Sequence, residues 1–180
     1  WEKALEEPAP LKSFRFVTGV WHYMRGVAWA NLGEISKAKK ELADLRELRR
    51  TLPKDYTVGR APASRLLGIA ELLVSADVKR ASGDLDEAID LLARATRIED
   101  SLAYNEPPDW YFPTRHILGA TLIEAGYLDE AEEIYWQDLR KAPQNGYSLR
   151  GLLNVAEKKA DPRFGGYKSK FDESWRRADI

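Results

Sequence analysis

Apolar residues recur at the three- and four-residue spacing of amphipathic helices through most of the chain, whereas short alternating patterns bounded by hairpin turns are missing. This pattern predicts an all-α protein. Gly33, Gly83 and Gly126 each follow a helical pattern, as glycine often does at a helix C-terminus. Such short links indicate antiparallel helical hairpins. The predicted helices cover residues 14–32, 35–51, 62–82, 85–99, 113–125, 128–141, 146–159 and 168–178.

The second helix of each hairpin opens on a similar hexapeptide. Gly-Asp-Leu-Asp-Glu-Ala at 83–88 and Gly-Tyr-Leu-Asp-Glu-Ala at 126–131 differ at one position, and Gly-Glu-Ile-Ser-Lys-Ala at 33–38 is a looser copy. Asp84 followed by Glu87 also approximates a capping box at the helix start. Aligning the copies gives one small position, at Gly26, Ala76 and Gly119, and one large position, at Leu42, Leu92 and Tyr135.

These repeats resemble tetratricopeptide repeats, whose helical hairpins are about 34 residues long. Residues 112–143 match the family pattern best, 20–53 match well, and the middle copy departs at Ser75 and Lys79, where large apolar residues are usual. The chain is also similar to the C-terminal part of a group of bacterial proteins of this family. That similarity rests on Trp-His-Tyr-Met-Arg-Gly, Glu-Pro-Pro-Asp-Trp-Tyr-Phe-Pro-Thr-Arg and Pro-Gln-Asn-Gly-Tyr-Ser-Leu, at 21–26, 106–115 and 143–149.

The resemblance implies a right-handed α-α superhelix, a solenoid of helical hairpins that forms a single domain over residues 1–180. Its hairpins would cover residues 14–51, 62–99 and 113–141. Two further helices, 146–159 and 168–178, would follow, and the last, which contains Trp175, would act as a C-terminal capping helix that covers the final exposed apolar face.

Two joints interrupt the regular spacing, because the three glycines lie 50 and then 43 residues apart. The joints span residues 52–61 and 100–112. The second overlaps Tyr-Asn-Glu-Pro-Pro-Asp-Trp-Tyr-Phe-Pro, 104–113, in which residues before proline favour extended backbone and Pro113 suits a helix start. We expect a stiff aromatic joint close enough to a groove for Tyr104 or Tyr111 to contact a ligand.

Composition restricts the partners. The 28 basic and 29 acidic residues give a net charge of −1, which argues against nucleic-acid binding. The longest apolar run, Leu66 to Ala76, contains Glu71 and is too short to span a membrane.

The chain begins at Trp1 without a signal-like segment, so it is expected to be a piece of a longer protein. The compartment stays unknown; the cytoplasm is favoured, although a targeting signal could precede Trp1.

No catalytic constellation is present, so we expect no enzymatic activity from these residues. The chain has no cysteine, no nucleophile elbow and no phosphate-binding glycine loop, and no cofactor is predicted. His22 and His116 are far apart and lack the close spacing of a metal-binding motif, so no metal site is predicted either.

Arg25 and Arg115 are unusual because each falls near a packing face where an apolar residue is expected. A buried guanidinium needs an acidic or carbonyl partner. The predicted structural polar cluster is His22, Arg25, Glu106, Asp109 and Arg115, and the carboxylates considered as partners are Glu71, Asp77, Glu106 and Asp109. The arginines could instead receive a ligand carboxylate. If the cluster is structural, Arg115 pairs with Glu106 or Asp109 and thereby fixes the joint to the helix that follows it.

The expected function is a protein-interaction or scaffolding module whose concave groove binds a peptide or a partner helix. The groove candidates are Tyr23, Asp77, Arg80, His116 and Glu124. Tyr23, Val27 and Val74 replace the lysines and asparagines by which some family members clamp a peptide carboxylate. The alternative is the C-terminal part of a larger ligand- or metal-binding protein, with an enzyme among the options and its reactive groups upstream of Trp1. Self-association through the N-terminal end is a third prediction.

Overall fold

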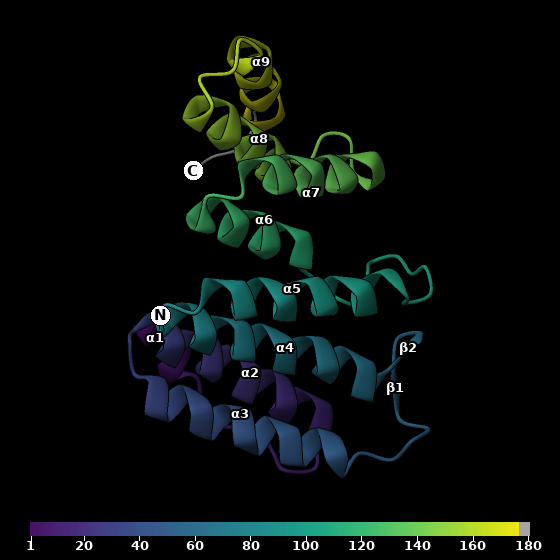
Figure 1. The fold of residues 1–180 in the computed structure, drawn as a ribbon. Coiled ribbons are helices and arrows are strands. Elements are labelled where there is room, and N and C mark those ends of the chain that lie inside the picture. The colour runs from purple at the N-terminus through teal and green to yellow at the C-terminus, as the bar shows by residue number, and fades with distance from the viewer. Residues whose placement is uncertain (177–180) are drawn as a thin grey trace. The chain divides into compact units, whose positions relative to one another are not determined.

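The computed structural model describes residues 1–176, which contain nine helices and one two-stranded hairpin (Figure 1). The all-α class predicted from the sequence is confirmed. The chain divides into two compact units, Trp1–Phe112 and the part from Pro113 onward. The single repeat domain expected over residues 1–180 would include both units, and it stays a prediction.

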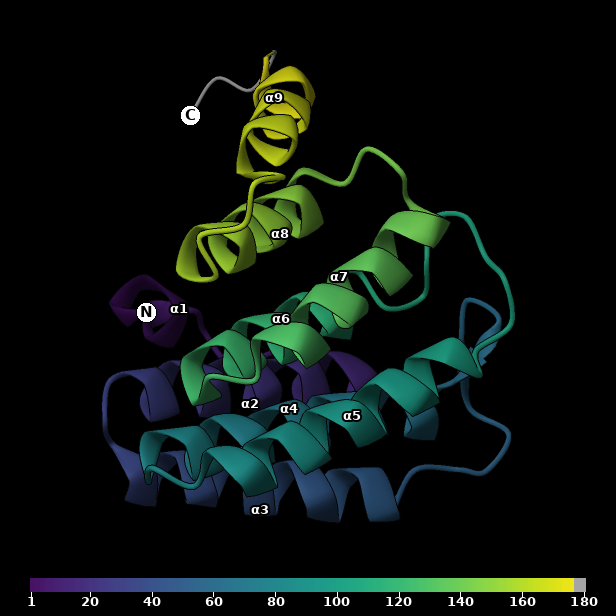
Figure 2. The same cartoon turned by 45° about the horizontal axis from the view of Figure 1, so that its top comes forward.

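The first unit consists of two antiparallel helical hairpins with short additions. Figures 1 and 2 show α2 to α5 lying side by side, and α4 contacts each of the other three. Fully buried leucines and an isoleucine fill the space between these helices: Leu45, Leu66, Leu67, Ile69 and Leu92. The elements are α1 (Glu2–Glu6), α2 (Arg15–Asn31), α3 (Ile35–Arg50), β1 (Thr57–Val58), β2 (Ala61–Pro62), α4 (Ala63–Ala81) and α5 (Leu85–Asp100).

The second unit contains α6 (Thr114–Ala125), α7 (Leu128–Lys141), α8 (Gly146–Lys158) and α9 (Phe164–Trp175). Helix α8 contacts α6, α7 and α9. The ring of Tyr135 on α7 lies against both Gly119 of α6 and Gly151 of α8, where any side chain would collide with it. The small repeat position, Gly119, thus leaves the space that the large repeat position, Tyr135, fills within this hairpin.

The glycines predicted to end helices do so by adopting positive φ. Gly33, Gly83 and Gly126 have φ of 79°, 81° and 86°. Glycine adopts this conformation readily because glycine has no β-carbon. Asp84 begins α5 by accepting a hydrogen bond from the Glu87 backbone N–H at 3.4 Å. The chain therefore reverses at the three sites indicated by the repeated hexapeptides.

Three elements differ from the sequence-based expectation. Helix α1 was not predicted, and the first joint contains the β1–β2 hairpin, where Thr57 pairs with Pro62 and Val58 with Ala61. Helix α9 begins four residues earlier than expected and ends at Trp175, and expected positions 177 and 178 lie outside the described residues. Gly165 and Gly166 lie within α9, although the sequence suggested that its helix begins after them.

The longest apolar run of the chain lies in α4 and is buried against α2, α3 and α5. The two polar residues that depart from the repeat pattern have partners. Ser75 donates to the Glu71 carbonyl at 2.7 Å, and Lys79 pairs with Asp84 at 3.1 Å. Among the helices that the structure describes, none combines the length and apolarity of a membrane span.

Candidate functional site

The adjoining helices α2 and α4 carry a hydrogen-bonded polar network formed by Asn31, Asp77 and Arg80. Arg80 Nη2 donates to Asn31 Oδ1 at 2.9 Å and lies 3.4 Å from Asp77 Oδ1. Asn31 Nδ2 donates to Asp77 Oδ2 at 3.4 Å. The Arg80 side chain remains 34% exposed. Two of the predicted groove residues, Asp77 and Arg80, are thus brought together, and Asn31 joins them from the neighbouring hairpin.

Tyr23, the third groove candidate of this unit, is buried beside the network. Its ring lies edge-on to Trp110, with centroids 5.6 Å apart. Burial first, and then the neighbouring Tyr111 and Asp77, raise the pKa of Tyr23 far above its ordinary value. Tyr23 is therefore a neutral, packed side chain, whereas Tyr111 beside it is 71% exposed.

Residues 104–112 are anchored by polar and aromatic contacts within the first unit. Asp109 Oδ1 accepts a hydrogen bond from Asn105 Nδ2 at 2.7 Å and another from the Arg60 backbone N–H at 3.4 Å. Trp110 is buried, and Tyr104 donates to Glu106 at 2.9 Å while remaining exposed. Because Arg60 belongs to the β1–β2 turn, the two joints contact each other.

A second polar cluster lies between α2 and α3 of the first hairpin. Arg25 Nε donates to Glu41 Oε1 at 2.8 Å, and His22 Nδ1 lies 2.7 Å from Glu41 Oε2. Arg25 also donates to the Leu5 carbonyl at 3.0 Å and lies over the Trp21 ring. Burial opposes ionisation of Glu41, but the hydrogen bonds from His22 and Arg25 outweigh it and lower the pKa of this carboxyl.

The acidic partner expected for Arg25 is therefore present, but the residue is Glu41 and not one of the four carboxylates considered from the sequence. Glu71 instead pairs with Arg46 and Arg49 at 2.9 and 2.8 Å. The sequence does not single out Glu41, because this residue lies in a lysine-rich run that resembles an ordinary solvated helix face. Its 8% exposure is evident only once α2 covers α3.

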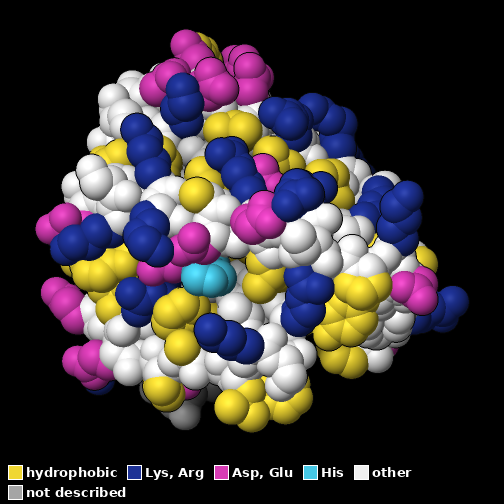
Figure 3. Space-filling model, turned by 90° about the horizontal axis from the view of Figure 1, so that it is seen from below, with side chains coloured by type: hydrophobic (Ala, Val, Ile, Leu, Met, Phe, Trp, Pro, Cys, Tyr) yellow, Lys and Arg dark blue, Asp and Glu magenta, His cyan; other side chains and the backbone are white. Residues whose placement is uncertain are grey.

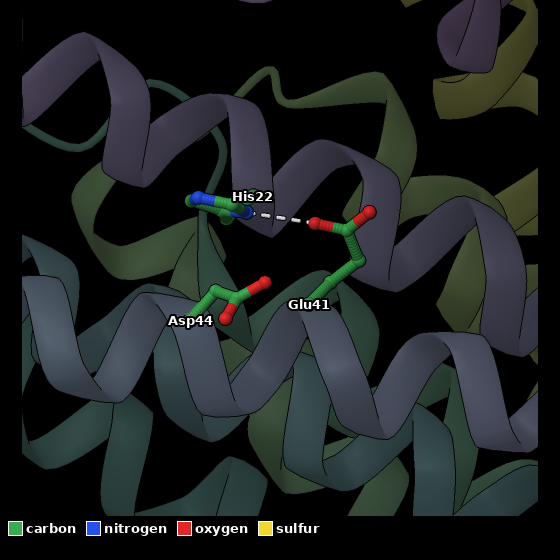
Figure 4. Close-up of side chains that lie close together, drawn as sticks. All are labelled: His22, Glu41 and Asp44. Carbon is green, nitrogen blue, oxygen red and sulfur yellow. Dashed lines mark hydrogen bonds and ion pairs between the residues drawn. The ribbon is translucent and has the colours of Figure 1, made fainter. Parts of the chain in front are cut away.

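His22, Glu41 and Asp44 also form a possible metal-ligand set, because one ligand atom from each lies within 4.8 Å of the others (Figure 4). No local sequence pattern indicates this set. Its histidine comes from α2 and its carboxylates from α3, so no short local motif joins them. Glu41 and Asp44 are three residues apart and share one face of their helix.

His116, a groove candidate of the second unit, is buried at 8% exposure in a different network. Its Nε2 lies 3.2 Å from Asp138 Oδ2 and 3.0 Å from Asn145 Nδ2. Ser148 donates to the same Asp138 oxygen at 2.6 Å. Burial raises the pKa of Asp138, but these hydrogen bonds and the charges of His116 and Arg115 outweigh it, so the net shift is downward.

This set of serine, histidine and aspartate does not have the arrangement of a nucleophilic triad. In such a triad the serine hydroxyl is hydrogen-bonded to the imidazole, which accepts its proton. The Ser148 hydroxyl is donated to Asp138, and Ser148 is fully buried. The network therefore fits a structural role that joins α6, α7 and α8.

The remaining predicted residues differ in exposure. Glu124 is exposed on α6, whereas Arg115 is 7% exposed near Asp138. The pinning of the joint by Arg115 stays a prediction. A pocket of about 580 Å³ in the second unit contains none of the groove candidates; its lining is Pro143, Gln144, Leu149, Lys170, Glu173, Ser174 and Arg176.

No protein-family model matches the chain, and the comparison with curated proteins gives no significant sequence match.

Proposed function

We propose that the chain is a tetratricopeptide-like repeat module, a solenoid of helical hairpins with a terminal capping helix, that binds a peptide or partner helix. Two features support this assignment. The repeated hexapeptides stand at the starts of α3, α5 and α7, and α2 and α4, the first helices of successive hairpins, contact each other. Helical repeats that stack in this way commonly present an extended binding surface.

The observation that carries the binding proposal is the Asn31–Asp77–Arg80 network on α2 and α4. Its groups are held in place by one another, so a ligand would not have to order them. Arg80 and Asn31 offer donors to peptide carbonyls, and Asp77 offers an acceptor to peptide N–H groups. The exposed ring of Tyr111 lies beside this face through its contact with Tyr23 and adds an aromatic contact surface.

The proposal is tested by selecting peptides from a random display library on the purified chain. The affinities of the selected peptides are then measured for wild type, Arg80→Ala and Asn31→Ala. Each substitution is expected to weaken binding about tenfold, because a buried ligand carbonyl would lose its hydrogen-bond partner. Lys168→Ala on α9 is the control, since it removes an exposed cation from the other unit. Selected peptides that bind all variants equally, or a library that gives no binder, would contradict the proposal.

The second-unit candidates need a separate test because they differ in burial. Glu124→Ala changes an exposed side chain and leaves the buried residues of α6 in place. His116→Ala also disrupts the buried Asp138 network. Weakened binding by that variant could therefore come from a destabilised fold as well as from a lost ligand contact. Glu124→Ala is therefore the variant to measure with the selected peptides. A loss of affinity would indicate that the second unit also contacts the selected peptides.

A further inference from the structure

The α2–α3 hairpin holds an imidazole and two carboxylates at ligand spacing. We propose that His22, Glu41 and Asp44 bind a divalent transition-metal ion, with Zn²⁺ as the ion to test. Their ligand atoms lie within 4.8 Å of one another, so small side-chain rotations would place all three around one ion at the usual distances of about 2.0–2.2 Å. This site is separate from the proposed peptide-binding face, because it uses the surfaces by which α2 and α3 meet each other.

The ligand positions are fixed by helices. His22 lies within α2, and Glu41 and Asp44 lie on one face of α3, which packs along α2. The side chains of His22 and Glu41 are 16% and 10% exposed, whereas Asp44 is 41% exposed. The site is therefore enclosed on the Glu41 side and open to solvent on the Asp44 side. Figure 4 shows the three side chains facing one another between the two helices.

The surroundings orient the ligands. Arg25 holds Glu41 Oε1 at 2.8 Å, which leaves Oε2 directed at His22 Nδ1. Metal ligands are commonly oriented by such outer hydrogen bonds. Lys40 lies 2.7 Å from Asp44 Oδ2, but its side chain is 76% exposed and can move into solvent when a cation arrives. Figure 3 shows a histidine side chain at the surface with acidic groups beside it and Lys and Arg around them.

Metal binding at this site involves no redox change. His22 Nδ1 and Glu41 Oε2 lie 2.7 Å apart. The imidazole would bind the metal through the Nδ1 lone pair, so any proton on Nδ1 moves to Nε2 or to solvent. Arg25 and Lys40 offset the two carboxylate charges, so we expect an affinity below that of thiolate-rich structural sites.

The ligand chemistry favours zinc or a neighbouring ion over magnesium and calcium. One imidazole nitrogen with two carboxylate oxygens suits Zn²⁺, Co²⁺, Ni²⁺ or Mn²⁺, whereas hard cations prefer an all-oxygen set. Three protein ligands leave at least one coordination position for water. The chain contains no cysteine, so no thiolate competes for the metal.

The experiment is a calorimetric titration of the EDTA-treated full chain with ZnCl₂ in a non-chelating buffer. Wild type is expected to bind about one ion per chain, and Asp44→Asn and His22→Gln are each expected to weaken binding at least about tenfold, the scale found when metal sites are perturbed. Asp172→Asn is the matched control. Asp172 pairs with Lys168 at 2.7 Å and i,i+4 spacing, as Asp44 does with Lys40, so its removal should leave zinc affinity unchanged.

Nitrogen-detected NMR of the imidazoles gives a readout that does not depend on variant folding. In wild type, Zn²⁺ should shift the His22 nitrogen resonances and leave those of His116 in place. The proposal is overturned if wild type binds no zinc, if Asp44→Asn or His22→Gln keeps wild-type affinity, or if the His22 resonances do not move. Circular dichroism establishes that each variant retains its helices.

Discussion

The ring of Tyr135 occupies the space that a side chain on Gly119 would need. A β-carbon at Gly119 would lie 2.5 Å from Tyr135 Cζ, closer than non-bonded carbon atoms approach. Gly119→Ala is therefore expected to lower the free energy of unfolding by about 1–3 kcal/mol, the cost of overpacking a core, despite the better helix propensity of alanine. Urea denaturation measures the change.

Gly165→Ala is the control for this substitution, because a β-carbon there meets nothing within 4 Å. It should leave stability unchanged or raise it by up to about 1 kcal/mol, since glycine is a poor helix former. Combining Gly119→Ala with Tyr135→Leu should cost less than the sum of the two single changes, as expected for residues in contact. A fully additive pair would show that the ring does not restrict this position.

The buried carboxylate of Asp138 is expected to stabilise the second unit in a pH-dependent way. Its folded-state pKa is lowered, so its contribution is fully present above the unfolded value of about 3.9 and is lost as pH falls through the folded pKa. Asp138→Asn should cost about 1–3 kcal/mol at pH 7, because His116 and Ser148 lose a charged acceptor. The difference from wild type should shrink at pH 3.

Denaturant titrations at the two pH values measure this difference. Asp172→Asn serves as the control because Asp172 pairs with an exposed lysine, and its effect should be small at both values. A penalty for Asp138→Asn that is equally large at pH 3 and pH 7 would mean that ionisation of Asp138 is not what stabilises the network.

Glu41 is expected to stabilise the first hairpin more than other carboxylates on α3. It accepts a hydrogen bond from Arg25 on one oxygen and lies against His22 on the other, and its side chain is 10% exposed. Glu41→Gln should lower the free energy of unfolding by about 1–3 kcal/mol, since a partly buried guanidinium loses its counter-charge. Glu47→Gln, in an exposed pair with Arg50 on the same helix, should change little. Equal effects of the two substitutions would remove the special role of Glu41.

The contact between the two joints predicts a difference between two positive-φ glycines. Gly59 has φ of 58°, and a β-carbon there would collide with the Asp109 carboxylate, whereas Gly33 has open space around it. Gly33→Ala should cost about 1 kcal/mol from backbone strain alone. Gly59→Ala should cost more, and the excess should disappear in an Asp109→Ala background. Thermal unfolding of Gly33→Ala, Gly59→Ala, Asp109→Ala and the Gly59→Ala/Asp109→Ala double variant measures the excess. If the excess persisted without the Asp109 carboxylate, the contact between Gly59 and Asp109 would not be its cause.

Segment 104–113 has buried side chains, as expected of a joint, and exposed aromatic side chains, as expected of a binding segment. Trp110 and Asp109 hold residues 104–112 against the rest of the first unit, as expected of a joint. Tyr104 and Tyr111 remain 78% and 71% exposed and are available to a ligand. The sequence indicated the stiffness through its prolines, but it could not indicate which rings are covered, because burial depends on Tyr23 from a distant helix.

The sequence by itself determined the long helices from α2 to α8 and the places where the chain reverses. Helical periodicity and positive-φ glycines are local properties, so Gly33, Gly83 and Gly126 could be recognised without knowledge of packing. Only the tertiary structure decided the partners of the polar residues. Arg25 meets Glu41 and His116 meets Asp138 because separate helices pack together, and a side chain far along the chain leaves no mark in the local pattern.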